Sequence, residues 1–367
     1  MPPRIAIFLP SLIGGGAERS ALFVAAALEQ AGYAVDLVVA VVKGALVDDP
    51  FVRAHLNDLR AKGELLALPG YLRYLRRVRP ALVISFVHSA NFLSGLGAQF
   101  DATPVIVSVR NTLDRERRDR WWVRRWLGFG PERRLYRRVA RVHTLSQGLA
   151  RQVARRFGIP AERIVVTASA VAPIRPRPDD VAEAAEAAAL APYLVSAGRL
   201  APIKGFDAVL RAHAASGIAM RLVIVGDGPE HARLEALAAS LGSDVRFVGY
   251  RDPVMPWLKG ARGFVYASRG EGLPRIVIEA LHAGLPIAAM REEGGTAELL
   301  GDGAFGRLVP LGDQAALAAA IRDIAEGRLH APDPAALAAH LEQFEPARVA
   351  AAYVGMVREV LAETGRG

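Results

Sequence analysis

The first forty residues alternate between apolar runs and a glycine turn, in an order that restricts the fold. A short apolar run, Arg4–Leu9, precedes the glycines Gly14–Gly16. A helical pattern over Ala17–Ala31 then stops at Gly32, and the apolar, β-rich run Tyr33–Val42 follows. Glycine ends helices readily because it adopts a left-handed conformation without steric cost. Strand, turn, helix and strand in this order form a βαβ unit, which predicts a parallel sheet.

The same alternation continues along the rest of the chain in two series. Between them lies Ala172–Pro178, whose three prolines predict a stiff, extended connector. The other predicted strands are Ala81–Val87, Pro104–Val109, Arg141–Leu145, Ile164–Thr167, Tyr193–Ala197, Arg221–Val225, Val245–Val248, Gly263–Tyr266 and Pro286–Ala289. A chain of 367 residues is long enough for two separate cores. We therefore predict two doubly wound, Rossmann-like α/β domains over residues 1–172 and 173–347, with a closing amphipathic helix over Arg348–Thr364.

Composition narrows the class of protein. Hydrophobic residues make up 52% of the chain and charged residues 23%, which is ordinary for a soluble globular protein. No uninterrupted apolar run approaches the roughly 20 residues that span a bilayer, and the N-terminal run is too short for a signal peptide. The chain has no cysteine, which excludes disulfides and thiolate metal sites and fits a reducing compartment. We expect a cytoplasmic protein.

The net charge of +9 is concentrated in the first half. Residues 1–170 hold 26 Lys and Arg against 13 Asp and Glu, whereas the remainder holds 20 against 24. The stretch Arg115–Arg141 has 11 arginines and three acidic residues, with Trp121, Trp122 and Trp126 among them. Tryptophan at the headgroup level and arginine on anionic lipid favour contact with an anionic membrane surface. A solvated basic helix is the alternative; nucleic acid is not expected, because no nucleic-acid-binding motif accompanies the arginines.

Two glutamates separated by seven residues form the most informative pattern of the second half. Glu271 lies in a glycine-rich turn, Pro274 follows at a position suited to the first turn of a helix, and Glu279 lies within that helix. The amides of a helix N-terminus attract phosphate, and carboxylates accept hydrogen bonds from vicinal hydroxyls. Amides that donate hydrogen bonds to phosphate, beside carboxylates that accept them from sugar hydroxyls, predict a nucleotide-sugar site.

A cationic loop, Ser196–Gly205, follows the first predicted strand of the second series. It contains Gly198, Arg199 and Lys204. Two cations at the carboxyl end of a strand can neutralise a diphosphate leaving group, and such electrostatic stabilisation is often the largest contribution to catalysis. The alternative is that both are solvated surface charges. The position of the loop at the ligand-binding edge of the sheet favours the functional interpretation.

The glycine turn Gly14–Gly16 sits between strand and helix, where a backbone can approach a phosphate closely. A dinucleotide fingerprint would need glycine at position 19, where the chain has Arg19, and the nucleoside-triphosphate loop is absent. A tight turn without a ligand is the alternative. The turn motivates a second hypothesis, a nicotinamide-dependent oxidoreductase; the basic segment motivates a third, a non-catalytic nucleotide-binding protein of the membrane surface.

Polar residues at other predicted strand ends are further candidates. His88 closes one strand of the first series, and Arg110 and Asn111 close the next, facing the same way. A lone histidine is more often structural than functional. Glu298, in the glycine turn Gly294–Glu298, either serves a nucleotide or starts a short helix.

Five motifs in order resemble the retaining glycosyltransferases of family four, which have the GT-B fold. They are Gly14–Arg19, Ser196–Phe206, Val225–Pro229, the pair Glu271 and Glu279, and Gly294–Glu298. The resemblance covers nearly the whole chain and is most specific from about residue 193 to 310. It implies two Rossmann-like domains facing across a cleft, with the donor bound in the C-terminal domain, the acceptor in the N-terminal domain, and the final helix crossing back.

The resemblance assigns roles at the donor residue by residue. Arg199 and Lys204 would clamp the diphosphate, Glu279 would bind the ribose hydroxyls, and Glu271 would bind hydroxyls of the transferred sugar. Backbone contacts would come from Gly15, Gly16, Gly272, Leu273 and Pro274. The only cofactor-like ligand implied is the nucleoside diphosphate sugar itself, as donor substrate, and no metal is expected.

The sequence departs from the family pattern on the acceptor side. Arg110 and Asn111 stand where some relatives have a histidine, and Ala168–Val171 replaces the usual Asn-Gly before the linker. Retaining transfer in this family proceeds by front-face attack without a protein nucleophile, so we assign none. Together with the Arg115–Arg141 segment, this leads us to expect a peripheral enzyme at the inner face of the cell membrane. It would move a hexose or N-acetylhexosamine from a uridine or guanosine diphosphate sugar to a lipid-linked or cell-envelope glycan.

Overall fold

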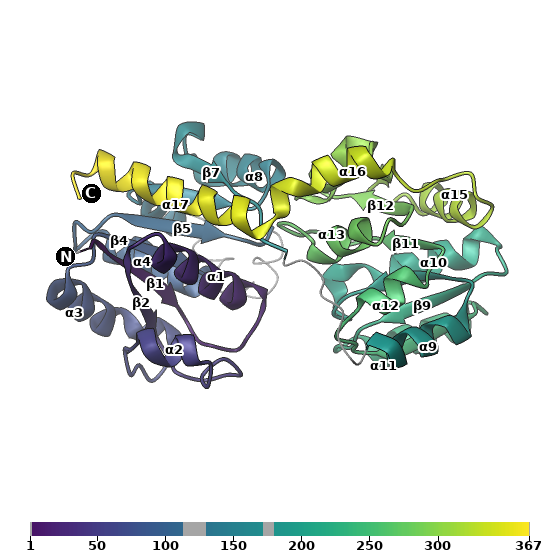
Figure 1. Cartoon of the computed structure of the whole chain (residues 1–367), viewed down its shortest axis with the longest axis horizontal. Helices are drawn as coiled ribbons and strands as arrows, with labels where there is room; N and C mark the ends of the chain where they lie inside the picture. The colour runs from purple at the N-terminus through teal and green to yellow at the C-terminus, as the bar shows by residue number, and fades with distance from the viewer. Residues whose placement is uncertain (1, 113–129, 172–179, 367) are drawn as a thin grey trace. The chain divides into compact units, whose positions relative to one another are not determined.

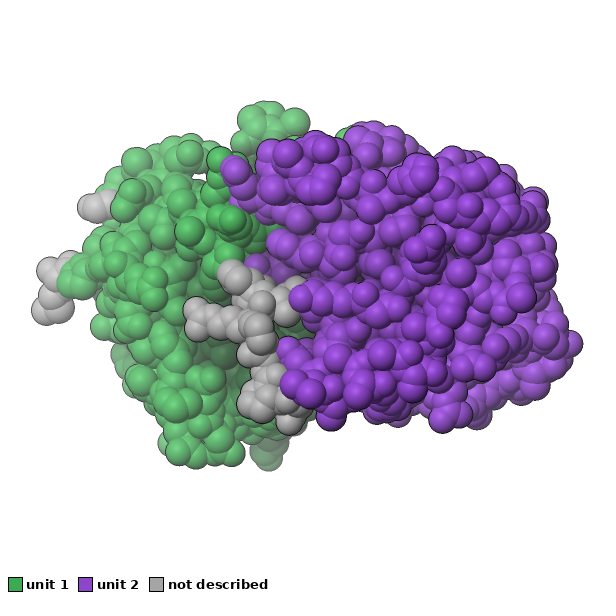
Figure 2. Space-filling view, turned by 45° about the vertical axis from the view of Figure 1, so that its right-hand side comes forward, with its two compact units in different colours: residues 1–170, 344–367 green, residues 171–343 purple. Residues whose placement is uncertain are grey.

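A computed structural model describes residues 2–112, 130–171 and 180–366. The chain forms two compact units (Figure 2). Unit 1 consists of residues 1–170 together with 344–367, and unit 2 of residues 171–343. Among the described residues, no helix is both long and apolar enough to cross a membrane. Each unit is a parallel α/β structure, as the alternating pattern predicts, and each is described separately below (Figure 1).

Unit 1 contains a parallel sheet whose seven described strands have the order β3-β2-β1-β4-β5-β6-β7. The strands are β1 (Arg4–Leu9), β2 (Ala34–Val39), β3 (Leu56–Asp58), β4 (Leu82–Phe86), β5 (Val105–Val109), β6 (Arg141–Thr144) and β7 (Ile164–Val166). The strand order reverses at β1 and β4, because β2 and β3 extend the sheet on one side and β5 to β7 on the other. In doubly wound sheets, the carboxyl ends of the two strands at such a reversal, here β1 and β4, are where ligands bind.

Helices cover both faces of the unit 1 sheet. They are α1 (Gly16–Gln30), α2 (Pro50–His55), α3 (Leu68–Val78), α4 (His88–Gly97), α7 (Gly130–Tyr136), α8 (Gln147–Phe157) and α17 (Pro346–Glu363), with the 3-10 turns η1 (Glu64–Ala67) and η2 (Ala161–Arg163). Ile5, Ile7 and Leu9 join the core beneath α1 and α17, whereas Ala6 and Phe8 join the core beneath α3, α4 and α8. Alternate residues of β1 are therefore buried on opposite faces, which explains why its sequence is continuously apolar.

Unit 2 repeats this architecture with six described strands in the order β10-β9-β8-β11-β12-β13. The strands are β8 (Tyr193–Ala197), β9 (Arg221–Val225), β10 (Val245–Gly249), β11 (Gly263–Tyr266), β12 (Ile287–Arg291) and β13 (Arg307–Pro310). The helices are α9 (Asp180–Leu190), α10 (Phe206–Ser216), α11 (His231–Ser240), α12 (Met255–Lys259), α13 (Arg275–His282), α14 (Thr296–Leu299), α15 (Gln314–Ala325) and α16 (Pro334–Leu341), with the 3-10 turns η3 (Pro202–Lys204), η4 (Gly301–Gly303) and η5 (Glu342–Phe344). The strand order reverses at β8 and β11.

A buried polar chain connects the middle strands of unit 1. Asn91 Nδ2 donates to Ser108 O over 2.8 Å, and Ser108 Oγ lies 2.9 Å from His143 Nδ1. His143 Nε2 lies 3.1 Å from Thr167 O, which can only accept, so Nε2 carries the proton and Nδ1 accepts from the serine. Burial and, to a smaller extent, the guanidinium of Arg110 together lower the pKa of His143 to about 3. The imidazole is therefore neutral in the folded protein.

This histidine should make the stability of unit 1 sensitive to acid. Below about pH 6.5 the unfolded chain binds a proton that the folded protein excludes, so stability falls as the pH is lowered toward 3. One such group accounts for up to about 1.4 kcal/mol per pH unit. Thermal unfolding of wild type and His143→Gln between about pH 7 and pH 4 should show a shallower loss of Tm in the variant, whose amide keeps hydrogen-bonding capacity without titrating. Parallel pH profiles would contradict the assignment.

Candidate functional site

The reversal of strand order in unit 2 positions the sequence-predicted cations and carboxylates at one edge of its sheet. β8 ends at Ala197, and the cationic loop follows it; β11 ends at Tyr266, and the turn with Glu271 follows. β8 and β11 are neighbours in the sheet. In doubly wound sheets, ligands bind at the carboxyl ends of the strands where the order reverses. The two predicted motifs thus meet at the ligand-binding edge, although Lys204 and Glu271 are 67 residues apart in the sequence.

An ion pair joins these two loops. Lys204 Nζ lies 2.9 Å from Glu271 Oε1, and the side chains are 18% and 11% exposed. A partly buried pair is screened less by solvent than one on the surface, so both charges are held in place. Arg199 is exposed, and its guanidinium lies on the same loop as Lys204. The ammonium has three donors and can donate to a second oxygen while it keeps the carboxylate.

Backbone and side-chain contacts fasten the two loops together. A Cβ at Gly205 would lie 1.9 Å from Ala267 O, and Gly205 has a left-handed φ of +68°, so glycine is required there on both grounds. Ser268 Oγ and Arg269 N donate to Ile203 O over 3.1 and 2.8 Å. The Arg269 guanidinium also forms a two-oxygen bond with the carboxylate of Asp207, at 2.8 and 2.6 Å. The sequence analysis missed this Arg269–Asp207 pair, because neither residue lies in a motif.

A third loop, which follows β12, packs against the turn that contains Glu271. Cβ atoms at Gly294 and Gly295 would lie 1.7 Å from Glu271 O and 2.5 Å from Gly272 O. Gly295 N donates to Glu271 O over 3.2 Å. The buried carboxylate of Glu292 accepts from the amides of Gly294 and Thr296, although burial raises its pKa. The glycines of this motif are therefore needed for close packing against the Glu271 turn.

The helix that carries the second glutamate begins one residue later than the sequence suggests. Pro274 is the N-cap of α13, with an extended backbone (φ −75°, ψ 103°), rather than its first helical residue. The N-cap forms no side-chain hydrogen bond with the helix; in the first turn, Val277 N donates to Pro274 O over 3.0 Å. Gly272, Leu273 and Pro274 are buried beside this helix start. A helix N-terminus of this kind attracts phosphate.

Glu279 lies in the second turn of α13 and is half-buried. Burial raises the pKa of Glu279, and the nearby charge of Asp252 raises it too. The guanidinium of Arg275, which comes within 4.0 Å of the Glu279 carboxylate, lowers this pKa. The carboxylate is thus held in an environment that costs free energy when it is ionised. Glu298 lies in the first turn of α14 and is also half-buried.

The Val225–Pro229 turn has a structural explanation in unit 2. Cβ atoms at Gly226 and Gly228 would lie 2.0 and 2.4 Å from the carbonyl oxygens of Gly198 and Leu200. Both glycines have positive φ, and Gly198 itself has a φ of +145°. The turn packs directly against the start of the cationic loop, and it fixes that loop's backbone.

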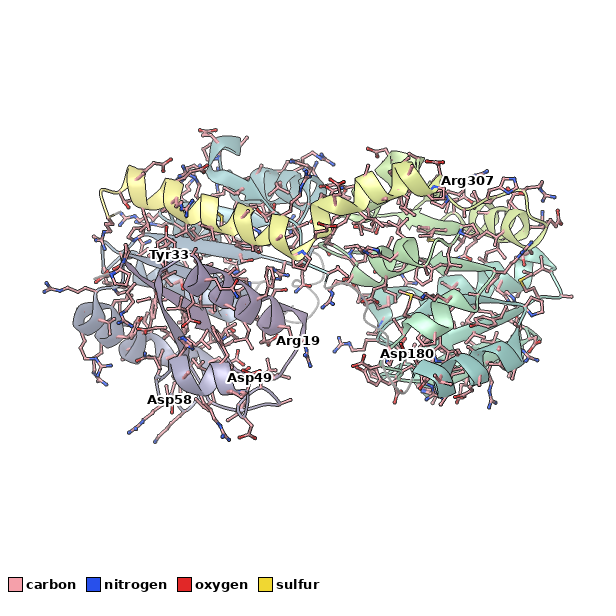
Figure 3. All side chains as sticks on the ribbon, in the orientation of Figure 1. Arg19, Tyr33, Asp49, Asp58, Asp180 and Arg307 are labelled. Atoms are coloured by element: carbon pink, nitrogen blue, oxygen red, sulfur yellow. The ribbon has the colours of Figure 1, made fainter. Side chains whose placement is uncertain are left out.

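In unit 1, the glycine turn and His88 lie at the corresponding reversal. Gly15 is the N-cap of α1, and Gly16 begins the helix; both are exposed. A Cβ at Gly16 would meet nothing within 4 Å, so sterics do not demand glycine there. Arg19, labelled in Figure 3, donates from Nε to Gly14 O over 3.2 Å and so covers the turn.

His88 begins α4 directly after a strained residue. Val87 has φ +73° and ψ 145°, a conformation that a β-branched residue adopts only when its surroundings enforce it. His88 Nε2 lies 3.2 Å from Oε1 of Glu132, whose side chain is 9% exposed. Sequence analysis missed Glu132, because it lies in the basic segment and reads as one charge among many. Such strain is typical of functional sites.

The end of β5 is occupied by an arginine with several partners. Arg110 Nη2 donates to Ser20 Oγ over 2.8 Å and to Ser169 Oγ over 2.6 Å, and its guanidinium lies 5.8 Å from the Phe86 ring centroid. Asn111 is half-buried beside it. Arg110 therefore ties α1 and the segment after β7 to the strand ends, and its sequence neighbour Asn111 lies at the same edge as His88.

The basic segment Arg115–Arg141 is described only in part. Residues 113–129, with Trp121, Trp122 and Trp126, lie outside the described residues. The described part forms α7 and the start of β6. The predicted connector Ala172–Pro178 lies entirely outside the described residues.

Two family models match most of the chain. The model for "Glycosyltransferase Family 4" matches residues 14–173, and the model for "Glycosyl transferases group 1" matches residues 191–327. The first lies in unit 1 apart from its last residues, and the second lies in unit 2.

Curated relatives are similar over part of their length. The lipopolysaccharide core biosynthesis glycosyltransferase LpsE of Rhizobium meliloti is 35% identical over 136 residues, which are 36% of this chain and 39% of the relative. The D-inositol 3-phosphate glycosyltransferase of Acidothermus cellulolyticus is 31% identical over 235 residues, which are 58% of this chain and 52% of the relative. The aligned part thus spans about half or less of these relatives.

Solved structures share the fold over almost the whole chain. The crystal structure of Anabaena Alr3699/HepE in complex with UDP has a TM-score of 0.77 at 19% identity and covers 98% of this chain and 100% of that one. WaaG, a glycosyltransferase involved in lipopolysaccharide biosynthesis, has a TM-score of 0.66 at 18% identity and covers 94% of both chains. These neighbours are of the GT-B type.

Proposed function

The chain belongs to glycosyltransferase family 4, and from that premise we propose that it is a retaining hexosyltransferase. It moves a hexose or an N-acetylhexosamine from a nucleoside diphosphate sugar to a lipid-linked or cell-envelope glycan. The names of the curated relatives, which include lipopolysaccharide core glycosyltransferases, support the acceptor class, and the UDP complex of a structural neighbour supports the donor class. Family membership favours this function over a nicotinamide-dependent oxidoreductase.

The observation that carries the proposal is the Lys204–Glu271 pair at the strand-order reversal of unit 2. In the proposed complex, Lys204 and Arg199 bind the diphosphate, and Glu271 accepts hydrogen bonds from hydroxyls of the transferred sugar. The start of α13 faces the distal phosphate, and Glu279 binds the ribose. One cation thus touches both the carboxylate that holds the sugar and the phosphate that leaves it.

The proposed reaction breaks the bond between the sugar's anomeric carbon and the diphosphate oxygen. An acceptor hydroxyl attacks the anomeric carbon from the same face, and its proton passes to the departing phosphate oxygen. Negative charge grows on the diphosphate as the bond breaks, and Arg199 and Lys204 stabilise it more strongly than in the ground state. No protein nucleophile is needed, because attack on the face from which the diphosphate leaves retains the anomeric configuration in one step; no protein base is needed, because the leaving group takes the proton.

Unit 1 supplies the acceptor side in this proposal. His88, oriented by Glu132, and Asn111 lie at the carboxyl ends of β4 and β5 and contact the acceptor. Gly15 and Gly16, exposed at the start of α1, offer backbone amides that suit a phosphate group. The positive balance of residues 1–170 suits an acceptor presented at the cytoplasmic face of an anionic membrane, where we place the enzyme as a peripheral protein.

Replacing Glu279 should weaken donor binding and, at the same time, stabilise the donor-free protein. Glu279→Gln is expected to weaken donor binding roughly 10- to 100-fold, the effect of losing a charged acceptor. The same change should raise the Tm of the donor-free protein at neutral pH, because burial penalises the ionised carboxylate only in the folded state. Wild-type donor affinity should fall on acidification from a higher pH than the ordinary pKa of about 4.3 would give.

Thermal-shift titration with uridine and guanosine diphosphate sugars measures both effects, because a bound ligand raises the Tm by mass action. Glu359→Gln, an exposed glutamate of α17, is the matched control. Unchanged affinity in Glu279→Gln would refute the ribose-binding role. Stabilisation by a nicotinamide dinucleotide and by no sugar nucleotide would overturn the proposed function.

A further inference from the structure

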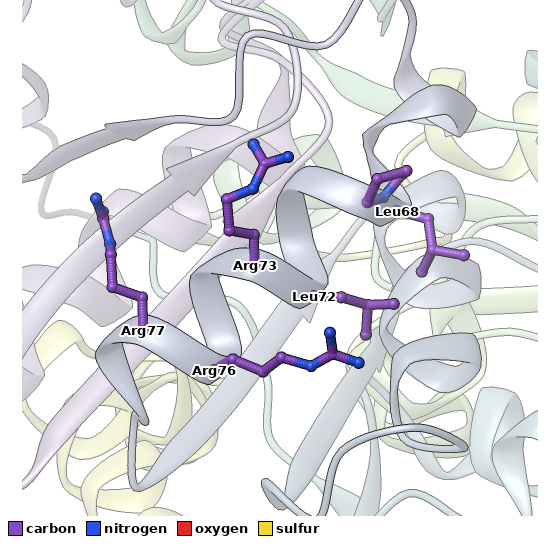
Figure 4. A pocket seen from close by; sticks show the side chains of 6 residues that line it. Leu68, Leu72, Arg73, Arg76 and Arg77 are labelled. Atoms are coloured by element: carbon purple, nitrogen blue, oxygen red, sulfur yellow. The ribbon is translucent and has the colours of Figure 1, made fainter.

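The surface formed by η1 and α3 combines exposed leucines with arginines that have no ion-pair partner among the described residues. Figure 4 shows the shallow groove along α3, which is lined by Leu68, Pro69, Leu72, Arg73, Arg76 and Arg77. Leu68, Leu72 and Arg76 are spaced four residues apart and form one row of the helix, and Pro69, Arg73 and Arg77 form the adjacent row. The helix thus carries apolar residues near its start and cations toward its end.

The apolar part of this surface continues into η1. Leu65 and Leu66 are 50% and 68% exposed and are among the large hydrophobic residues that unit 1 leaves in solvent. They lie in η1, which directly precedes α3, whereas Leu68 and Leu72 are half-buried and pack partly against the core of unit 1. Single exposed leucines are ordinary, but two adjacent exposed leucines beside the accessible parts of Leu68 and Leu72 form an apolar patch, a feature that is typical of interaction sites.

The opposite side of α3 is fixed in the core. Tyr71, Tyr74 and Leu75 are at most 3% exposed, and the Tyr71 ring stacks on Phe8 of β1 at 4.6 Å between centroids. Tyr74 OH donates to Asp36 over 2.8 Å. The helix therefore cannot rotate its leucines inward without breaking these contacts, and its outer face is preformed.

The charge of the surface is strongly one-sided. Residues 60–79 contain six Lys and Arg and a single acidic residue, Glu64, whose carboxylate accepts from Ser89 Oγ over 2.8 Å. Arg73, Arg76 and Arg77 are exposed and form no ion pair within the described part of the chain. A partner for this face must therefore be anionic and must also accept leucine side chains.

We propose that the η1–α3 surface, defined as Leu65, Leu66, Leu68, Leu72, Arg73, Arg76 and Arg77, docks unit 1 on an anionic lipid bilayer. The leucines enter the boundary between headgroups and acyl chains, and the arginines lie against lipid phosphates with their stems along the apolar surface. Each arginine near an anionic membrane strengthens binding about fivefold, so three contribute about a hundredfold. This inference rests on the peripheral placement in the proposed function and names the surface that makes the contact; vesicle binding is measured without reference to transferase activity, so the two can fail separately.

Vesicle flotation tests the surface directly. Wild type should float with vesicles of equal parts phosphatidylglycerol and phosphatidylcholine, less so at high salt, and should not float with phosphatidylcholine alone. The triple variant Arg73→Glu, Arg76→Glu, Arg77→Glu should lose about a hundredfold or more in affinity for the anionic vesicles. The double variant Leu65→Ser, Leu66→Ser should also bind more weakly, and its remaining binding should be abolished by salt.

A matched control reverses three exposed arginines of unit 2, Arg211, Arg246 and Arg262, which changes the net charge equally and should leave flotation unchanged. Circular dichroism and Tm confirm that each variant is folded. The proposal is overturned if wild type fails to float, or if the η1–α3 triple variant floats like wild type. It is also overturned if reversal of Arg117, Arg118, Arg124 and Arg125 alone abolishes binding, since that would assign the contact to the other basic segment.

Discussion

Replacing Lys204 by Gln is expected to lower kcat by about 10²–10³-fold, the usual effect of removing one preorganised charged donor from a developing anion. The ammonium lies 2.9 Å from Glu271 at the strand-order reversal of unit 2, where the proposed diphosphate leaves. Glutamine keeps much of the length of the side chain but has no charge. Because the charge on the leaving group grows in the transition state, the loss should appear in kcat more than in KM.

Steady-state kinetics with the donor identified by thermal shift measures this effect. Lys259→Gln, an exposed lysine at the end of α12, is the matched control and should behave as wild type. The Tm of Lys204→Gln must also be measured, because the variant leaves Glu271 without its cationic partner in a buried position. A folded Lys204→Gln protein with wild-type kcat would show that the ammonium does not act on the leaving group.

The variant Gly294→Ala is expected to reduce kcat/KM by roughly 10²-fold, although Gly294 is not one of the charged residues of the site. Its Cβ would lie 1.7 Å from the carbonyl oxygen of Glu271, so the Glu271 turn must move by an ångström or more to admit it. The displacement of Glu271 from Lys204 misplaces the carboxylate proposed to hold the sugar. Overpacking of this kind also costs about 1–3 kcal/mol of stability.

The control for Gly294→Ala is Gly355→Ala in α17. No atom lies within 4 Å of a Cβ at Gly355, and its φ is not positive, so alanine should stabilise the helix by about 0.5–1 kcal/mol. Comparison of kcat/KM and Tm for the two variants separates packing at the site from a general effect of added methyl groups. Wild-type kcat/KM in Gly294→Ala would mean that the Glu271 turn tolerates displacement, and the proposed sugar contact would then be wrong.

The strands that border the sites could be predicted because their sequences are continuously apolar. β1, β8, β9 and β11 have the predicted bounds, since strands buried on both faces consist of apolar runs that end at turns. β3 and β13 were not predicted. β3 has three residues, two of them Asn57 and Asp58, and β13 contains Arg307 and Pro310, residue types that are uncommon in strands but tolerated at a sheet edge.

The residues of the candidate site could be predicted from the sequence, but their contacts could not. Lys204 and Glu271 each lie in a glycine-containing loop after a strand, and this position alone suggested a role. Which cation meets which carboxylate depends on strand order, which sequence patterns do not specify. Glu132, the partner of His88, has no signal beyond its charge, and Pro274 was placed one residue too far into α13 because proline suits both positions.

The η1–α3 surface did carry a signal in the sequence. Helical spacing relates the leucines at positions 65, 68 and 72 and the arginines at 73, 76 and 77. The run of arginines and tryptophans after residue 115 is denser, and the membrane hypothesis was therefore based on that segment. The pattern became informative once the burial of Tyr71 and Tyr74 showed which side of the helix faces outward.

Unit 1 is assembled from both ends of the chain, with Val357, Val360 and Leu361 of α17 in the same core as β1. During synthesis on the ribosome, the first 170 residues emerge long before the helix that covers them. Unit 2 is translated as an uninterrupted insertion and can complete its core earlier. Residues 1–170 therefore keep part of one apolar face uncovered until α17 has been translated, and a stop codon before Pro346 would damage the unit that was made first.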